Sequence, residues 1–254
     1  AGPELPALTE ALAAAAPTRG LEIMQAMALP HALATSLANG LVDAPAPAAA
    51  DLRAAERTPA AEARWRALTN ALDAVQARLP DGARQEVLIL GAPPPALLAR
   101  AMTRAARVVI SDPDPRRVRA LAVDAPAIPG VRCTALADLE DGAFDLVLCA
   151  DALHRAGEDG LPRLRALLRP GGALAAAERA PALLDDLTEG RVAGWWRDTV
   201  AADFAIGRRR AGAVWAAALA DAGFAGAEGD ALAGGEGALI LAAAPDRAPQ
   251  AVET

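Results

Sequence analysis

The feature that most constrains the fold is an alternation of short apolar runs with helical stretches, which begins near residue 86. Residues 87–90 form an uninterrupted apolar run that precedes a helical stretch, and residues 108–110 repeat the pattern before a helix that begins at Pro115. Further apolar runs lie at residues 131–133, 144–149, 173–177 and 238–242. This alternation predicts an α/β fold, a Rossmann-like parallel sheet with helices on both faces.

The first part of the chain has a different pattern, which predicts a helical amino-terminal subdomain at residues 1–82. Its clearest helix covers residues 59–79 and has arginine and glutamate on its polar side. The sequence Pro80-Asp81-Gly82 then stops it. The apolar residues of this helix recur at spacings of three and four: Trp65, Leu68, Leu72 and Val75. We therefore divide the chain into this subdomain, an α/β core at residues 83–245 and a tail at residues 246–254.

Composition and charge exclude several classes of function. The formal net charge of −7 argues against binding to nucleic acid or to an anionic membrane surface. The longest strongly apolar run, residues 211–220, is about half of the roughly 20 residues that a membrane span requires. Two cysteines and two histidines make neither a zinc cluster nor a disulfide framework, so we expect a cytoplasmic protein without a metal. The chain begins without methionine, as a fragment of a longer protein or a processed chain would.

Parallel sheets of this kind bind ligands at the carboxyl ends of their strands. The residues expected there are Gly91, Asp112, Asp138 and the stretch after Cys149. Asp112 lies where an acidic side chain bonds ribose hydroxyls, but it can equally form a turn or cap the next helix. The G-x-G-x-x-G pattern of dinucleotide-binding dehydrogenases does not follow the first apolar run, which disfavours that class.

Four short motifs lie within the α/β core. They are Phe144-Asp145-Leu146-Val147 with Ala150-Asp151-Ala152-Leu153-His154, then Leu168-Arg169-Pro170-Gly171-Gly172-Ala173-Leu174, Gly194-Trp195-Trp196, and Trp215-Ala216-Ala217-Ala218-Leu219 with Ala222-Gly223-Phe224. Together they resemble the class I S-adenosylmethionine-dependent methyltransferases, and more narrowly the C-methyltransferase domain of type I polyketide synthases. The resemblance implies a seven-stranded sheet whose final strand is antiparallel, with residues 1–82 as a lid over the active site.

The loop after the first apolar run departs from this family. Members usually read Val-Leu-Glu-Ile-Gly-Ala-Gly-Thr-Gly, whereas here Ile89 replaces the glutamate, and Pro93 and Pro95 replace two glycines. Proline has no N–H to donate and its φ is fixed near −65°. A hydrogen bond to a carboxylate contributes roughly 1.5–3 kcal/mol, so the loss of two costs about 3–6 kcal/mol, or about two to four orders of magnitude in affinity.

These substitutions predict a pseudo-methyltransferase, a structural domain of a modular polyketide synthase that binds no S-adenosylmethionine and lies beside neighbouring synthase domains. In the alternative, Pro93 and Pro95 only form a rigid turn. The domain would then be an active C-methyltransferase that uses S-adenosylmethionine on the α-carbon of a β-ketoacyl thioester, carried by the phosphopantetheine arm of an acyl carrier protein.

The resemblance also implies site residues. His154 matches the family's base, which removes a proton from the α-carbon, and Glu178 matches the glutamate that orients the imidazole. Without such a role, His154 would cap a helix and Glu178 would be a solvated charge. Gly91, Asp112 and Asp138 would contact the cofactor, Asp138 at the adenine amino group, although a solvated turn is the simpler interpretation of its acidic loop.

Two further groups have both a structural and a functional interpretation. Arg208, Arg209 and Arg210 could bind the phosphate of the pantetheine arm, but a charged helix face is the simpler interpretation. Trp195 and Trp196 are expected to pack the lid rather than stack on a substrate.

Overall fold

The computed structural model describes residues 59–123, 128–182, 185–186, 189, 195–197, 206–235 and 237–246. The strands of its main sheet are β1 (Gln85–Gly91), β2 (Ala105–Ser111), β3 (Val131–Cys133), β4 (Phe144–Ala150), β5 (Leu168–Arg179), β8 (Ala225–Ala231) and β9 (Gly237–Ala243). The helices are α4 (Pro59–Gln76), α5 (Pro95–Met102), α6 (Pro115–Ala122), η3 (Leu136–Asp138, a 3₁₀ turn), α7 (Leu153–Leu167) and α9 (Gly212–Asp221). The short strands β6 (Trp196–Arg197) and β7 (Ile206–Gly207) form a separate antiparallel pair.

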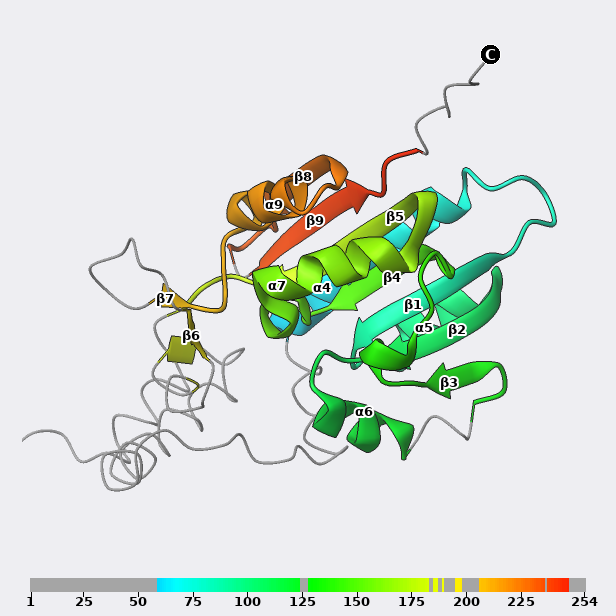
Figure 1. Cartoon of the computed structure of the whole chain (residues 1–254), viewed down its shortest axis with the longest axis horizontal. Coiled ribbons are helices and arrows are strands. Elements are labelled where there is room, and N and C mark those ends of the chain that lie inside the picture. The colour runs from blue at the N-terminus through cyan, green and yellow to red at the C-terminus, as the bar shows by residue number, and fades with distance from the viewer. Residues whose placement is uncertain are drawn as a thin grey trace, which may run out of the picture.

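The main sheet has seven strands in the order β3-β2-β1-β4-β5-β9-β8 (Figure 1). The first five in this order pair in parallel. β9 runs antiparallel to both of its neighbours, β5 and β8. This topology confirms the predicted seven-stranded sheet with an antiparallel final strand, and it rules out the dehydrogenase alternative.

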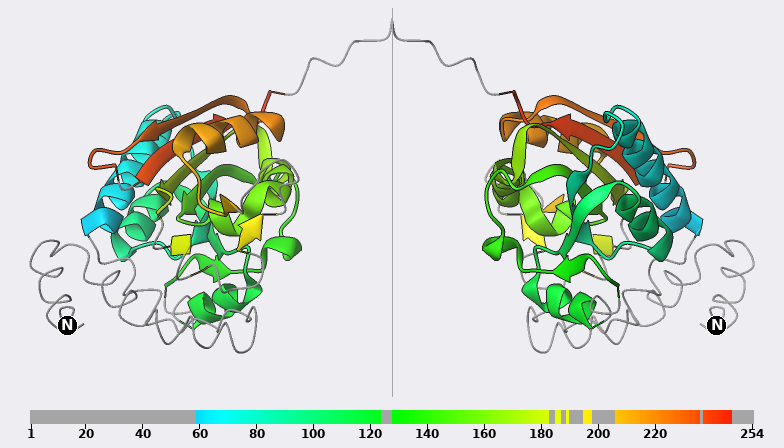
Figure 2. Two further views of the ribbon diagram at one scale, coloured as in Figure 1. Left: turned by 90° about the vertical axis from the view of Figure 1, so that its left-hand side faces the viewer. Right: turned by 90° about the vertical axis from the view of Figure 1, so that its right-hand side faces the viewer.

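Helices cover both faces of the sheet, and each face has its own apolar core (Figures 1 and 2). On one face, α7 and α9 pack through Leu161 and Trp215, which are both fully buried. On the other, α4 and α5 pack through Leu68 and Leu97. Because both faces are buried, the central strands are apolar at consecutive positions instead of alternating, and this makes them recognisable in the sequence.

The helix α4 packs directly on the sheet, mainly against β5, with further contacts to β9 and α5. Trp65, Leu68 and Leu72 are buried against the strands, as their spacing predicted. Arg64 is also buried, so the prediction that the arginines lie on the other side of this helix is wrong for this residue. Residues 1–58 of the predicted lid and the tail after Asp246 lie outside the described residues, and the domain division stays a prediction.

Several elements differ from the sequence-based expectation. α4 ends at Gln76, three residues before its predicted end. β5 begins at Leu168, five residues before the predicted strand, because Leu168 already pairs with Phe144 of β4. β8 was not predicted, since its sequence Ala-Gly-Ala-Glu-Gly-Asp-Ala contains no β-branched or aromatic residue. The helix α7 has a kink at Gly157, whose φ is +65°. Within the described residues, no helix combines the length and the apolar character that a membrane crossing needs.

Candidate active site at the carboxyl ends of the strands

The loop after β1 is shaped by Gly91 and the three prolines that follow. Gly91 has a φ of +93°, and a Cβ placed on it would lie 2.3 Å from the carbonyl oxygen of Ala150 in β4, so only glycine fits here. α5 begins at Pro95, where a missing N–H costs the helix nothing. Pro93, Pro94 and Pro95 are thus compatible with the start of α5, but they give three successive positions without a backbone N–H donor.

Asp112, which follows β2, has a carboxylate that is already fully engaged. The side chain is buried, and the Arg155 guanidinium binds it in a bidentate manner, with Nε 3.0 Å from Oδ1 and Nη2 2.8 Å from Oδ2. Arg117 donates from Nε to Oδ2 at 3.1 Å, and the backbone N–H of Asp114 donates to Oδ1 at 2.9 Å. The predicted turn-forming role is confirmed, while Asp114 rather than Asp112 caps α6.

Arg155 connects the end of β2 to the end of β4. Besides Asp112, its guanidinium reaches the carbonyl oxygen of Asp151, with Nη1 2.7 Å away, and Nη1 also lies 3.2 Å from Nε2 of His154. Its side chain is 18% exposed. One arginine side chain therefore occupies the carboxyl edge of the sheet between the predicted ribose-binding carboxylate and the predicted catalytic base. Nothing in the sequence alone pointed to Arg155.

The structure brings His154 and Glu178 together. Nδ1 of His154 lies 3.1 Å from Oε2 of Glu178, and both side chains are buried. Oε1 of Glu178 accepts the backbone N–H groups of Ala152 and Leu153 at 2.6 and 2.8 Å. Glu178 is therefore not a solvated charge: it satisfies the free N–H groups at the start of α7, a role that the sequence offered to His154.

Burial dominates the titration of this pair. It raises the pKa of Glu178 to about 7, with a further contribution from the negative charge of Asp151. The pKa of His154 is well below its usual range, first because of burial and then because of the positive charges of Arg209 and Arg155. A neutral imidazole with its proton on Nδ1 fits these contacts, since Nδ1–H then donates to Glu178 and Nε2 accepts from Arg155.

Asp151 completes the cluster from the end of β4. Its φ of +49° is unusual for a residue other than glycine. Oδ1 accepts the backbone N–H of Arg179 at 3.0 Å and Nη1 of Arg209 at 2.8 Å. Burial alone would raise the pKa of Asp151, but Arg209 beside it holds it well below its usual range.

Asp151, His154 and Glu178 can offer ligand atoms that lie within 4.8 Å of one another. The contacts of these groups do not suit a metal ion. Arg209 already neutralises the carboxylate of Asp151, and Arg155 already occupies Nε2 of the His154 imidazole. A cation would also be repelled by both arginines. We assign no metal to this cluster.

The remaining predicted residues lie apart from this cluster or have other contacts. Asp138 is exposed in η3, as expected for a solvated turn, and its contact with adenine stays a prediction.

The arginines 208–210 precede α9 instead of forming a helix face. Arg209 pairs with Asp151. Arg210 is buried, pairs with Glu158, and has its Cζ 4.8 Å from the ring centre of Trp215. The prediction of a charged helix face is therefore wrong.

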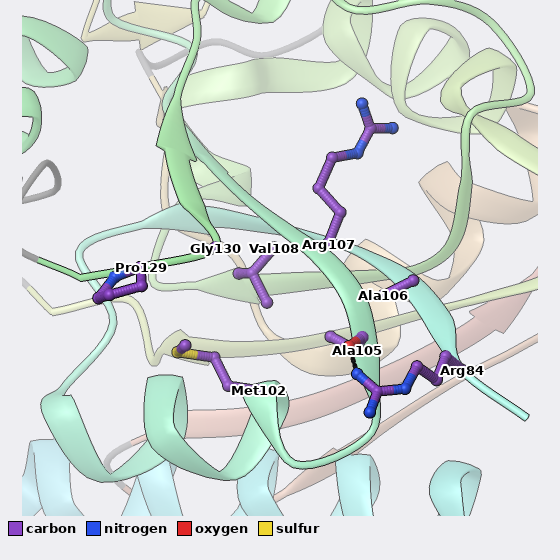
Figure 3. Close-up of a pocket in the computed structure, with 8 residues that line it drawn as sticks. All are labelled: Arg84, Met102, Ala105, Ala106, Arg107, Val108, Pro129 and Gly130. Atoms are coloured by element: carbon purple, nitrogen blue, oxygen red, sulfur yellow. Dashed lines mark hydrogen bonds between the residues drawn. The ribbon is translucent and has the colours of Figure 1, made fainter. Parts of the chain in front are cut away.

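A hollow of about 190 Å³ lies at the opposite end of the sheet, where β2 and β3 begin (Figure 3). It is lined by Met102, Val108 and Pro129 together with Arg84 and Arg107. Figure 3 shows the Arg107 side chain directed away from the other lining residues, and its Nε donates to Glu86 outside the hollow. Nη1 of Arg84 donates to the carbonyl oxygen of Ala105, which is itself a lining residue. We assign no ligand to this hollow.

Comparisons with known proteins agree with the topology. Residues 90–176 match a family model described as a methyltransferase domain. The crystal structure of the CurJ carbon methyltransferase is similar, with a TM-score of 0.75 and 16% identity over 94% of this chain and 70% of that chain. The CMeT domain of the citrinin polyketide synthase gives a TM-score of 0.73 and 16% identity over 94% of this chain and 69% of that one. No curated protein sequence matches this chain.

Proposed function

We propose that this chain, which has the class I S-adenosylmethionine-dependent methyltransferase fold, is a degenerate C-methyltransferase-like domain of a modular polyketide synthase. In this proposal it binds no S-adenosylmethionine and has a structural role beside neighbouring synthase domains. The observation that carries the proposal is the bidentate pairing of Asp112 with Arg155 at the predicted ribose-binding position.

The residues present do not fit the cofactor at this position. A ribose needs a carboxylate with free acceptor sites, but each oxygen of Asp112 already accepts from an arginine and Oδ1 also accepts a backbone N–H. Displacing Arg155 would leave a cationic side chain, only 18% exposed, without its carboxylate partner. Breaking such a pair costs several kcal/mol, which the binding of a nucleoside would have to supply.

The proline run supports the same conclusion independently. Pro93, Pro94 and Pro95 stand where backbone N–H groups would meet the methionyl part of the cofactor in the family that the chain resembles. None of the three can donate a hydrogen bond. Their φ is also fixed, so the loop cannot rearrange to present other donors as glycines would.

The His154–Glu178 pair, the dyad of this site, does not present a free base. The lone pair of His154 Nε2 faces Nη1 of Arg155 at 3.2 Å, while Nδ1 is engaged with Glu178 at 3.1 Å. The imidazole is buried, and the cationic guanidinium disfavours its protonation. A general base must reach a substrate proton, and this nitrogen is covered by an arginine.

The second candidate is an active C-methyltransferase acting on the α-carbon of a carrier-bound β-ketoacyl thioester. The buried contact between His154 and Glu178 favours it, because a carboxylate on Nδ1 sets the tautomer that a base at Nε2 requires. In that case Arg155 would have to leave Nε2 when a substrate enters. An acyl carrier protein with its phosphopantetheine arm would then be a partner.

Calorimetric titration of the full chain with S-adenosylmethionine tests the proposal. No heat of binding is expected at millimolar cofactor, and micromolar binding would contradict it. A matched triple variant, Pro93→Gly, Pro95→Gly and Arg155→Ala, returns donors to the loop and removes the bidentate partner of Asp112, so it is expected to bind more tightly than the wild type. Asp112 keeps its contacts with Arg117 and the backbone N–H of Asp114 in this variant. Methyl transfer to a β-ketothioester surrogate, abolished by His154→Ala, would establish the second candidate.

A further inference from the structure

Arg64 is a charged residue in the apolar stripe of α4. It lies three residues after Ala61 and four before Leu68, both fully buried, and is itself only 4% exposed. The carbons of its side chain pack over Gly237, where a Cβ would lie 3.1 Å from both Cγ and Cδ of Arg64. The side chain therefore runs along the start of β9 and the end of β5.

The Arg64 guanidinium has too few partners for its burial. Its Nε is buried and has no hydrogen-bond partner in the part of the chain that the structure describes. Its nearest aromatic contact is Trp65, with Cζ 5.9 Å from the ring centre, and within the described residues no ion pair joins it to a carboxylate. A buried donor without an acceptor is costly, so a partner that offers oxygen atoms is expected at this place.

The charges around Arg64 balance only if every neighbouring carboxylate is ionised. Nη2 of Arg179 lies 2.7 Å from Oδ1 of Asp185, and Nη1 of Arg209 lies 2.8 Å from Oδ1 of Asp151. Glu178 is the third carboxylate beside these three guanidinium groups. Burial raises its pKa to about 7, so it carries only part of a negative charge at neutral pH. Burial lowers the pKa of Arg64, and the charges of Arg179 and Arg209 lower it further, against the opposing effect of Asp151 and Glu178.

We infer that Arg64, Arg179 and Arg209 form a binding site for a small oxyanion, a phosphate or a carboxylate group, at the carboxyl ends of β4 and β5. An oxyanion would supply the missing negative charge, and its oxygens match the planar donor pattern of guanidinium groups. The site borders the cluster of Asp151, His154 and Glu178 through the pairing of Arg209 with Asp151, but the inference does not depend on whether the chain binds S-adenosylmethionine.

Thermal unfolding of the full chain in inorganic phosphate, in acetate and in sodium chloride of equal ionic strength tests this site. Phosphate or acetate is expected to raise the melting temperature above the chloride reference, since a ligand of the folded state stabilises it. The anion with the larger effect identifies the group. Equal melting temperatures in all three salts would overturn the inference. Because phosphate and acetate also stabilise folded proteins in general, a rise supports the site only where it depends on Arg64.

The variants Arg64→Met and Arg66→Met separate the site from general salt effects. Both remove one positive charge from α4, but Arg66 is exposed, so its variant is expected to respond to anions like the wild type. Arg64→Met is expected to bind the anion at least about tenfold more weakly, because a hydrogen bond to a charged group contributes at least that factor. An unchanged anion response in Arg64→Met would also overturn the inference.

Discussion

Arg155 binds Asp112 through two parallel N–H···O contacts of 3.0 and 2.8 Å, across 43 positions of the sequence. The same guanidinium lies 3.2 Å from Nε2 of His154. A single side chain therefore links the position predicted for the cofactor with the position predicted for catalysis. If the domain is degenerate as proposed, Arg155 makes the contacts with Asp112 and His154 that a bound cofactor and substrate would otherwise make.

Replacing Arg155 by methionine is expected to change both of its neighbours. The pKa of His154 should rise, because one of the positive charges that lower it is removed. Stability should fall by about 1.5–3 kcal/mol for the lost charge-assisted hydrogen bonds, although Arg117 still pairs with Asp112. Titration of the histidine ring protons by NMR and urea unfolding measure the two effects.

Arg163→Met is the matched control, since this arginine lies on the same helix and pairs with Asp141 at the surface. It should leave the titration of His154 unchanged and shift stability by no more than about 0.5 kcal/mol. A pKa of His154 that stays the same in Arg155→Met would show that the guanidinium does not act on the imidazole.

Glu178→Gln is expected to change how stability depends on pH. The pKa of Glu178 is raised from 4.5 to about 7 by burial and by Asp151, so between these values the folded chain holds a proton that the unfolded chain has released. This group therefore destabilises the fold as pH rises through that window, by up to about 1.4 kcal/mol per pH unit. Glutamine does not titrate, and its oxygen can still accept from Ala152 and Leu153.

The difference in unfolding free energy, Glu178→Gln minus wild type, should therefore increase from pH 4.5 to 7 in urea titrations. His154 titrates in the opposite sense, because its lowered pKa makes the unfolded chain the better proton acceptor below about pH 6.5. Because His154 contacts residue 178, its titration is followed in both proteins by NMR and its contribution is subtracted from the difference. Above pH 8 the difference should be constant, and a flat difference at all pH values would contradict the raised pKa.

The positions of the central strands could be predicted because each depends on local sequence, whereas the pairing of His154 with Glu178 was implied by the family resemblance. Residues 87–90 and 144–149 are apolar at nearly every position, which only strands buried on both faces require. His154 lies four residues after the end of β4, Glu178 lies in the last two residues of β5, and the carboxyl ends of neighbouring parallel strands meet at one edge. Their contact at 3.1 Å follows from this topology.

Arg155 and Arg64 could not be predicted in the same way. An arginine after a strand or on a helix usually faces solvent, and the pairing of Arg155 with Asp112 exists only once β2 and β4 are placed on either side of β1. For Arg64 a signal was present: the residue interrupts the apolar stripe of α4. The strand β8 had no signal, because its alanines and glycines carry no strand preference.

Leu68→Ala is expected to destabilise the whole α/β domain by about 2–5 kcal/mol, since it leaves a cavity between α4 and the sheet. Leu68 is fully buried, and α4 contacts β5, β9 and α5. Asn70→Ala on the exposed side of α4 should change stability by no more than about 0.5 kcal/mol. A single urea transition that shifts as a unit would show that α4 unfolds with the core, whereas a separate early transition would show that it belongs to a detachable subdomain.

Gly91→Ala is expected to be among the most destabilising single-methyl additions in the chain, at about 3 kcal/mol or more. The residue has a φ of +93°, and its new Cβ would lie 2.3 Å from the Ala150 carbonyl oxygen, a backbone atom of β4 that cannot turn aside. Gly82→Ala separates the two causes, because Gly82 has a φ of +76° and a methyl group added there would have nothing within 4 Å. That variant should lose only the conformational cost of about 1–2 kcal/mol. If urea unfolding gave the same loss of unfolding free energy for both variants, β1 and β4 would be able to separate at this point. The close contact between Gly91 and Ala150 would then not hold the loop in place.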